Sequence, residues 1–205
     1  NIGAMENKGV EVQLDFGIVR SKNFNWDVQL NITSLKNNIT KLPNNNTPIT
    51  SGTKRLEVGE DIFAFYLRRW YGVDPTDGAG LFYANATSTT DIRTGPKGEK
   101  LTNNPTNADF GYAGSAIPKH FGSINNTFTI QNISINFLLN YQKGGKFYDG
   151  NYAGLMAVTY GRALHTDALR AWKNPGDITD VPRLDINQSN ARFNEGQTVF
   201  TTLNP

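Results

Sequence analysis

The strongest constraint on this chain is a period of two in its apolar residues. From residue 10 to residue 18 the sequence reads VEVQLDFGI, with apolar side chains at the even positions and polar, acidic or glycine residues between them. The pattern returns over residues 26–33 and again over residues 123–141. Because successive side chains of a β-strand point to opposite faces, each stretch predicts a strand with one apolar and one polar face.

Turn residues separate these stretches and predict antiparallel hairpins. Three connections are tight: residues 21–23, 74–79 and 131–132. In the second, DPTDGA, proline fixes φ and glycine allows a positive φ. The sequence therefore predicts an all-β, antiparallel chain. Its strands are expected at about 8–20, 24–34, 60–73, 80–85, 120–130 and 133–143.

Long connections alternate with the tight ones and are expected at about 36–58, 85–118 and 144–198. Loops of this length are uncommon in compact domains, whereas outer-membrane barrels combine short turns with long outer loops. Since the smallest bacterial barrels have eight strands, six strands predict a sector of a larger transmembrane barrel. The alternative is a soluble sheet with its apolar face on a core. One short helix is expected near 154–173, before NPG at 174–176.

Composition excludes several classes of function. The chain has no cysteine, which excludes thiolate metal sites, thiol catalysis and disulfide scaffolds. Its 20 Lys and Arg are scattered among 18 Asp and Glu, so no basic patch points to nucleic acid. No apolar run is long enough for a transmembrane helix, which leaves membrane barrels open.

Catalytic and metal sites gain little support. The only histidines, His120 and His165, are far apart in sequence, and no GxSxG elbow is present. His165 with Asp167 supplies two ligands, which do not make a metal site. We therefore predict no catalytic residue, no metal and no cofactor.

Aromatic residues of the expected outer loops are the candidates for ligand binding. A ring stacks on the C–H face of a sugar while nearby amides and acids bind its hydroxyls. The substrate-binding candidates are Phe110, Tyr112, Tyr148, Tyr152 and Trp172. For each of them, packing within a loop or contact with a covering partner is the alternative interpretation.

Several phrases of the sequence resemble SusC/RagA-type TonB-dependent transporters of Bacteroidetes outer membranes. They occur in family order over nearly the whole chain. They are residues 1–12 (NIGAMENKGVEV), 25–27 (NWD), 65–70 (FYLRRW), 72–75 (GVDP), 112–119 (YAGSAIPK), 140–146 (NYQKGGK), 164–172 (LHTDALRAW) and 176–184 (GDITDVPRL). After residue 193 the stretch NEGQTVF departs from the family pattern.

The resemblance implies a sector of a 22-strand barrel in the outer membrane of a Gram-negative bacterium. It implies import of an oligosaccharide or a peptide, driven by the TonB complex through a plug domain, and a SusD-like surface lipoprotein as a lid. The chain is expected to be one part of the barrel domain, without the plug, with its apolar strand faces on outer-membrane lipid.

Two rival classes of function remain at this point. A secreted or surface carbohydrate-binding β-domain, like a lectin or an adhesin, would bury the apolar faces in a core and use the same loop aromatics. A glycosidase would need two carboxylates about 5–9 Å apart, and no pair is indicated. The position of the apolar faces, open or buried, separates the importer from the lectin.

Overall fold

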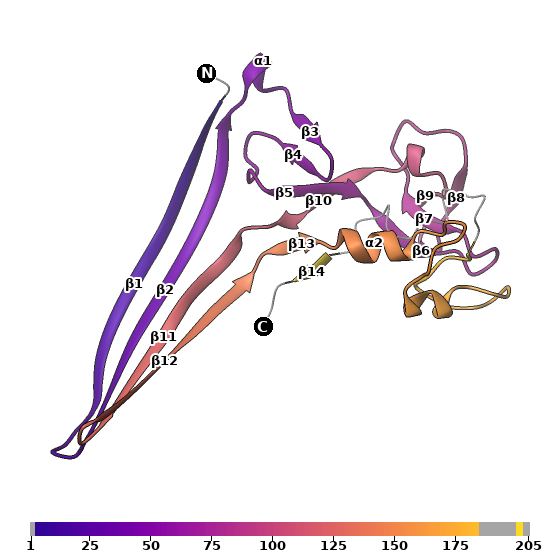
Figure 1. The fold of residues 1–205 in the computed structure, drawn as a ribbon. Helices are drawn as coiled ribbons and strands as arrows, with labels where there is room; N and C mark the ends of the chain where they lie inside the picture. The colour runs from indigo at the N-terminus through magenta and orange to yellow at the C-terminus, as the bar shows by residue number, and fades with distance from the viewer. Residues whose placement is uncertain (1–2, 185–199, 203–205) are drawn as a thin grey trace. The chain divides into compact units, whose positions relative to one another are not determined.

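The computed structural model describes residues 3–184 and 200–202 and is mostly antiparallel β-structure (Figure 1). The chain divides into two compact units. The first comprises Asn1–Ala64, Gly114–Phe147 and Thr202–Pro205, and the second comprises Phe65–Ala113 and Tyr148–Thr201. The chain thus passes between the units several times, and each unit is built from segments distant in sequence.

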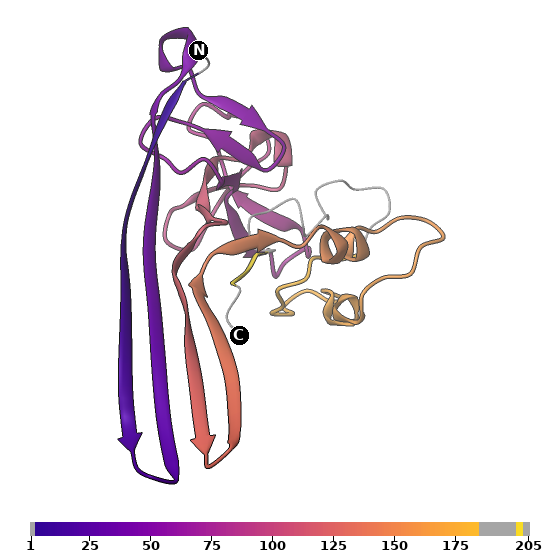
Figure 2. The same ribbon diagram turned by 60° about the vertical axis from the view of Figure 1, so that its left-hand side comes forward.

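Four long strands form the main sheet of the first unit. They are β1 (Ala4–Arg20), β2 (Phe24–Lys41), β11 (Pro118–Ile130) and β12 (Ile133–Gly144), in the order β1-β2-β11-β12 with every pair antiparallel. The tight turns of the two hairpins lie at the same end of the sheet (Figure 2). Gln131 has a φ of 53° in the second of these turns. The structure therefore has strands where they were predicted at about 8–20, 24–34, 120–130 and 133–143.

The three predicted hairpins do not follow one another in the sheet, because β2 of the first hairpin pairs directly with β11 of the third. Phe24 lies opposite Ile130, and the two strands remain paired as far as Ser34 and His120. Residues 42–117 therefore form one long connection between β2 and β11, which are neighbours in the sheet. The hairpin predicted from 60–73 and 80–85 belongs to this connection and adds no strand to the main sheet, because pairing between distant segments is invisible to local periodicity.

The first unit also contains short elements where a loop over 36–58 was predicted. β2 continues to Lys41, and α1 (Pro43–Asn46), β3 (Ile49–Ser51) and β4 (Lys54–Leu56) follow. Hydrogen bonds fix this segment to β2: Ile39 N donates to Glu60 O at 2.9 Å, and Gly59 N donates to Ile39 O at 2.9 Å. The strand β13 (Lys146–Tyr148) follows β12 after a glycine pair.

The second unit contains the other short strands. They are β5 (Ala64–Arg68), β6 (Trp70–Val73), β7 (Gly80–Tyr83), β8 (Ile92–Thr94), β9 (Lys100–Thr102) and β10 (Phe110–Ser115), with the 3-10 turn η1 (Pro105–Asn107). Four of them make a sheet in the order β6-β7-β9-β8, and β10 neighbours β5. Phe82, Leu101 and Thr102 are fully buried there. The loop predicted over 85–118 is therefore largely structured.

The prediction of a single strand over 60–73 is wrong. The chain forms two strands there, β5 and β6, which belong to different sheets and are separated by Arg69. Arg69 N donates to Asp109 O at 2.9 Å, while Arg69 O accepts from Tyr83 N at 2.9 Å. Asp109 N in turn donates to Tyr83 O at 2.8 Å. Three chain segments therefore meet at this residue, and β5 and β6 diverge from it.

A short helix occurs near the predicted place, with different bounds. α2 covers Gly150–Met156, and the 3-10 helix η2 covers Thr166–Arg170. Gly161 between them has a φ of 74°, which a helix does not accommodate. Met156, Ala171 and Val181 form a buried cluster here with Trp70 and Tyr152 packed against it. The strand β14 (Phe200–Thr202) follows, and the predicted loop end at 185–198 lies outside the described residues.

Within the described segments, no helix has both the length and the apolar character needed to cross a membrane.

One glycine of β11 lies where a side chain would not fit in the main sheet. A Cβ on Gly122 would overlap the backbone carbonyl of Asn31 on β2 and lie 2.8 Å from the Tyr141 hydroxyl on β12. The Tyr141 ring therefore occupies the space that a side chain at position 122 would need.

We expect Gly122→Ala to destabilise the sheet by about 1–3 kcal/mol, the usual cost of overpacking. The matched control is Gly17→Ala on β1, where the added Cβ would meet only the flexible Arg20 guanidinium. Denaturant unfolding measures both variants. Equal stability of the two variants would contradict the close approach described here.

Candidate functional site

The main sheet has one continuous apolar face. In an antiparallel pair, directly opposed residues share a face, and the register places apolar residues opposite one another on all four strands. The rung through Leu14 comprises Leu14, Leu30, Ile124 and Leu139. Neighbouring rungs continue this face with Val10, Val12, Phe16, Ile32, Val28, Trp26, Phe128, Ile130, Phe137, Ile135 and Ile133.

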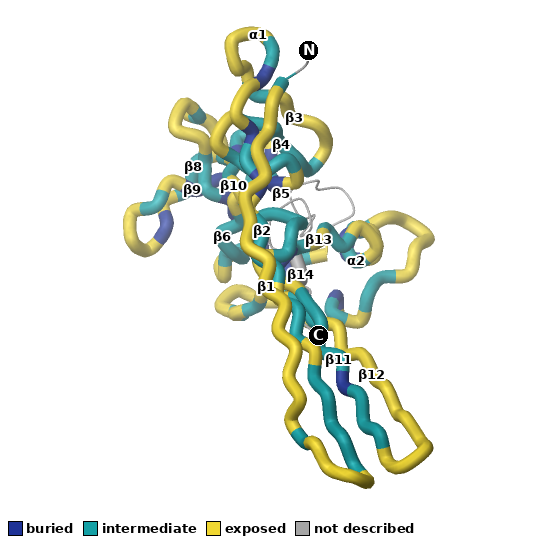
Figure 3. Tube along the Cα trace, turned by 90° about the vertical axis from the view of Figure 1, so that its left-hand side faces the viewer, coloured by how far each residue is buried: buried dark blue, intermediate teal, exposed yellow. Residues whose placement is uncertain are grey.

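This apolar face is open in the part of the chain that the structure describes. Val10 is 66% exposed and Ile133 is 64% exposed on the two outer strands. Figure 3 shows β1 and β12 as mostly exposed strands and β2 and β11 as half-buried ones. Contiguous apolar surface of this kind marks contact with a membrane or a partner.

Aromatic rings gather near the turn end of the apolar face. Phe128 stacks on Trp26 at 5.5 Å and on Phe137 at 5.7 Å between ring centroids. Asn126, an amide on this face, is buried, and its Oδ1 accepts a hydrogen bond from Trp26 Nε1 at 3.2 Å. The hydrogen bond from the indole offsets the free-energy cost of placing the Asn126 amide in apolar surroundings. Aromatic belts at the ends of membrane strands have this composition.

The opposite face of the same sheet is polar. Gln29 Nε2 donates to Asp15 Oδ1 at 2.8 Å, and Asn136 Nδ2 donates to Thr127 Oγ1 at 2.8 Å. Arg20 forms an ion pair with Asp27. Acids, amides and hydroxyls therefore dominate one side of the sheet, and aliphatic and aromatic groups dominate the other.

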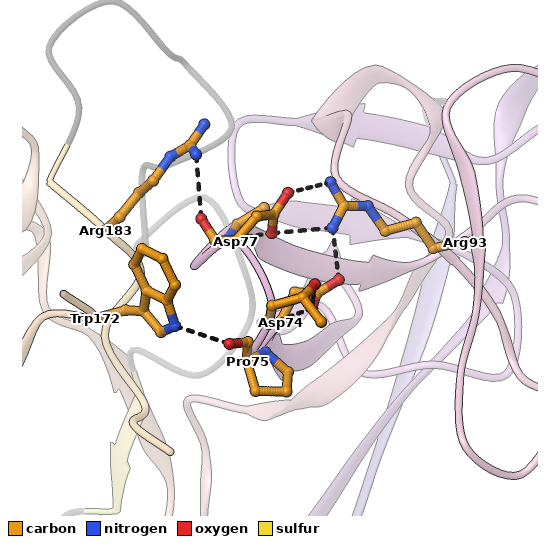
Figure 4. A network of polar contacts seen from close by, with 8 residues as sticks. Asp74, Pro75, Asp77, Arg93, Trp172 and Arg183 are labelled. Carbon is orange, nitrogen blue, oxygen red and sulfur yellow. Dashed lines mark hydrogen bonds and ion pairs between the residues drawn. The ribbon is translucent and has the colours of Figure 1, made fainter. Parts of the chain in front are cut away.

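In the second unit, the turn between β6 and β7 carries a network around one arginine (Figure 4). Arg93 on β8 donates to Asp74 Oδ2 at 2.5 Å and, through both terminal nitrogens, to Asp77 at 3.0 and 2.7 Å. Asp74 also accepts hydrogen bonds from the backbone and hydroxyl of Thr76. The carboxylates of Asp74 and Asp77 therefore stabilise the turn through these hydrogen bonds, in agreement with its turn-forming composition.

The carboxyl groups of the turn are held ionised. Hydrogen bonding to Arg93, with a backbone bond from Ala79, lowers the pKa of Asp77. Burial acts to raise the pKa of Asp74, but the hydrogen bonds from Thr76 and Arg93 outweigh it and lower that pKa. The two carboxylates in turn raise the pKa of Arg93, which is charged at every relevant pH.

Residues from the end of the described chain hold the other side of this turn. Trp172 Nε1 donates to Pro75 O at 3.1 Å, and Arg183 donates to Asp77 O at 3.1 Å. The indole ring lies against Gly78, where a Cβ would overlap it, and Gly78 has a φ of 73°. Trp172, a predicted ligand-binding residue, thus packs on the turn (Figure 4).

Phe110 and Tyr112 come together on one face of β10. Tyr66 on β5 stacks on Phe110 at 5.5 Å and makes a tilted contact with Tyr112 at 5.1 Å. Both β10 rings are exposed, at 39% and 37%. Arg68 lies 5.4 Å from the Phe110 ring centroid. Two of the five predicted residues therefore form an exposed aromatic cluster with a third ring, Tyr66.

Tyr152 lies in a different environment from these rings. Its hydroxyl donates to Asp167 Oδ2 at 2.9 Å, and its ring meets the edge of His165 at 5.0 Å. Burial, and then the bond to Asp167, raises the pKa of Tyr152 to about 12. Tyr148 is half-buried at the end of β13.

The described residues contain no group of three or more His, Cys, Asp or Glu side chains placed to bind a metal. His165 Nδ1 accepts from the backbone N–H of Asp167 at 3.1 Å and caps the N-terminus of η2, so this pair begins a 3-10 helix. Sequence reasoning missed Tyr66 and Arg93. Tyr66 alternates with buried Phe65 and Leu67 and could have been found from that pattern, whereas Arg93 carries no local signal.

An antiparallel sheet of long strands, apolar on one face and polar on the other, with tight turns at one end, defines a sector of a membrane β-barrel. The comparisons agree with this class and make it more specific. TonB-dependent receptor P39 of Formosa agariphila is 25% identical over 229 residues, covering 94% of this chain. TonB-dependent receptor P3 of the same organism is 28% identical over 198 residues, covering 89% of this chain.

Solved structures match the fold. The structure of the RagAB peptide transporter covers 98% of this chain with a TM-score of 0.81 at 20% identity. The RagAB peptide importer in its 'closed-closed' state gives a TM-score of 0.79 at the same identity. No family model matches the chain. The predicted resemblance to TonB-dependent receptors is confirmed, and the fold is consistent with the SusC/RagA type.

The chain corresponds to a part of these proteins. It spans 22% of receptor P39, 19% of receptor P3 and 22% of the RagAB chain.

We expect Arg93→Gln to destabilise the second unit by about 1.5–3 kcal/mol, because charged hydrogen bonds are lost and two carboxylates are left together. The pKa values of Asp74 and Asp77 are lowered in the fold, so their contribution is complete above their unfolded pKa near 3.9. It is lost as the pH falls through the folded pKa values. The stability gap between wild type and variant should therefore close in acid.

Urea unfolding of both proteins between pH 7 and pH 2.5 measures this gap. Arg162→Gln is the control, since Arg162 is an exposed cation of the same unit. A gap that stays constant with pH would show that Arg93 does not stabilise the turn through these carboxylates.

Proposed function

We propose that this chain is a wall sector and an outer-loop region of a TonB-dependent importer in the outer membrane of a Gram-negative bacterium. The open apolar face of the main sheet carries this proposal. The relatives are named as TonB-dependent receptors, and the solved structures of the same fold are titled as a peptide transporter and importer. Their names also support a role in transport rather than catalysis.

The apolar face has the dimensions of a membrane band. The nine residues from Val10 to Ile18 extend for about 27 Å at roughly 3.3 Å per residue. With the usual strand tilt of about 40°, that length spans about 20 Å of the bilayer, close to the roughly 25 Å apolar band of outer-membrane barrels. A lectin-like domain would need a core covering this face, and in the described chain the face is open.

In this proposal the apolar face contacts outer-membrane lipid and the polar face borders the lumen. The substrate is an oligosaccharide or a peptide, captured beneath a SusD-like lid lipoprotein at the outer loops. TonB acts through the plug. RagAB, titled a peptide transporter, supports the transport role and a peptide as one substrate class. The residues of this chain would contribute walls and loops.

Among the predicted binding residues, we propose Phe110 and Tyr112 as substrate contacts, with Tyr66 beside them. Their exposure and mutual packing present a preformed aromatic surface, which limits the entropy lost on binding. Tyr152 and Trp172 already make hydrogen bonds within the unit. We assign these two residues to holding the loop in place, and the role of Tyr148 stays a prediction.

A pair of adjacent substitutions tests the membrane assignment. Leu139 lies on the apolar face and Asn140 on the polar face of β12, and both are exposed. Leu139→Arg should reduce barrel stability by about 2–4 kcal/mol, the cost of arginine within a bilayer, and Asn140→Arg should change it little. On a water-exposed sheet both changes would be nearly neutral.

Heat-modifiable migration of the full-length protein from outer-membrane fractions measures barrel formation in each variant. A Leu139→Arg protein that assembles as well as Asn140→Arg would overturn the proposal.

For the aromatic surface, we expect Phe110→Ala with Tyr112→Ala to weaken substrate binding about 30-fold, since two aromatic contacts of about 1 kcal/mol each are lost. Calorimetry of the purified transporter with oligosaccharides and peptides measures the change. Tyr160→Ala is the control, because Tyr160 is 89% exposed. If the control and the double variant bind alike, these rings are not substrate contacts.

A further inference from the structure

The apolar face of the main sheet becomes basic at the end away from the hairpin turns (Figure 2). The rung that follows Ile32 comprises Val10, Ser34, His120 and Lys143. Lys8 and Lys36 lie opposite each other on the next rung of the same face. The face therefore ends in a basic strip of four exposed residues: Lys8, Lys36, His120 and Lys143.

The positive charge of the basic strip is only partly balanced within the described chain. Lys8 and Lys36 are directly opposed, and like charges in this arrangement destabilise a sheet. Glu6, one rung further out, forms an ion pair with Lys8 at 3.0 Å. Glu6 is the one carboxylate on this face of the described long strands, and the described residues form no ion pair with Lys36 or Lys143. An anion from outside the chain would offset this excess charge.

The opposite end of the apolar face carries no such charge. Phe24 lies opposite Ile130, and its ring stacks on Phe128 at 6.3 Å between ring centroids. From the rung of Phe24 to the rung of Ile32, this face of the described strands has no charged residue. The two edges of the apolar face therefore differ, with aromatic rings at the turn end and lysines at the other.

An outer membrane has a matching asymmetry, because phosphorylated glycolipid is concentrated in its outer leaflet. Outer-membrane barrels have short turns on the periplasmic side and long loops on the outside. The tight turns of β1-β2 and β11-β12 would then lie at the periplasmic side. The basic strip lies at the other end of these strands, where the long connections begin, and this end belongs to the outer leaflet.

The basic strip also lies at the depth of lipid headgroups. Leu30 is near the middle of the apolar rungs of β2, and Lys36 follows it by six residues. Six residues extend for about 20 Å, which is about 15 Å along the bilayer normal at a strand tilt of about 40°. Half of the apolar band is about 12 Å high. The Lys36 backbone would therefore lie just beyond the band, and its ammonium group would reach the headgroup layer.

We propose that the basic strip binds the phosphate groups of lipopolysaccharide in the outer leaflet. An ammonium group offers three N–H donors and a compact charge, which suits a phosphate. Lys8, Lys36 and Lys143 supply three such groups from adjacent rungs of three strands. The apolar rungs beside them would contact the acyl chains of the same lipid. The inference rests on the proposed function, which places this face against outer-membrane lipid.

Lipid binding by the full-length transporter, purified in detergent and freed of native lipid, tests the chemistry of the ligand. Native mass spectrometry compares three probes: phosphorylated lipid A, lipid A without its phosphates, and phosphatidylglycerol. We expect phosphorylated lipid A to bind about tenfold more tightly than either of the others, as the loss of charged hydrogen bonds predicts. Equal binding of dephosphorylated lipid A would indicate acyl-chain contact alone, and equal binding of phosphatidylglycerol would indicate general attraction to anionic lipid. Either result would overturn the inference.

Substitutions then locate the site on the protein. Replacing Lys8, Lys36 and Lys143 together by glutamine should weaken binding of phosphorylated lipid A about tenfold, because the charged donors are lost. Replacing the same three residues by arginine should preserve binding, since arginine also pairs with phosphate. Loss of binding in the arginine variant as well would contradict a site based on charge.

The matched control removes the same charge from exposed lysines outside the long strands: Lys22, Lys97 and Lys173, each replaced by glutamine. This control should bind phosphorylated lipid A as the wild type does. If the two glutamine variants lose the lipid equally, net charge determines binding and the inference is wrong.

Heat-modifiable migration separates this inference from the proposed function and verifies assembly of each variant. If the wild type forms a barrel but does not prefer phosphorylated lipid A, the lipid site is wrong and the barrel assignment stands. If the wild type forms no barrel, both are wrong. The comparison of the three lipids uses the wild type alone, so it decides the proposal even where a variant fails to assemble.

Discussion

The cross-strand register of the four long strands is the constraint on which the rest of this structure depends. Leu14, Leu30, Ile124 and Leu139 lie opposite one another only in this register. A slip of one residue would move the apolar side chains of a strand onto the polar face. Gly122 beneath Tyr141, and Trp26 beside Asn126, fit only this alignment. One choice of pairing therefore produces both the apolar surface that we assign to lipid and the polar surface that we assign to the lumen.

The second unit depends on a different kind of interaction. Its strands are short, so periodic apolar faces contribute less, and one arginine with two carboxylates organises the turn between β6 and β7. Trp172 and Arg183 bind the opposite side of that turn. Charged contacts of this sort would suit the outer loop that we propose, because they fix its shape without adding apolar surface.

The structure brings together some of the aromatic residues that the sequence offered as binding candidates and separates others, and the reasons are physical. Phe110 and Tyr112 alternate on a short strand, so their common face follows from the period of two, and the structure adds Tyr66 beside them. Tyr152 and Trp172 are equally aromatic, but they make hydrogen bonds to Asp167 and Pro75. Composition identifies rings in loops and does not tell an exposed ring from one that holds the loop together. The roles of the exposed rings stay proposals.

The sequence by itself determined the long strands, their tight turns and the sorting of side chains onto two faces, because these follow from local alternation and turn chemistry. It also determined the resemblance to TonB-dependent receptors. Only the tertiary structure decided that β2 pairs with β11 across residues 42–117, that Arg69 divides a predicted strand and that Arg93 anchors the turn at Asp74 and Asp77. These features join residues far apart in sequence, and such contacts depend on how the whole chain packs.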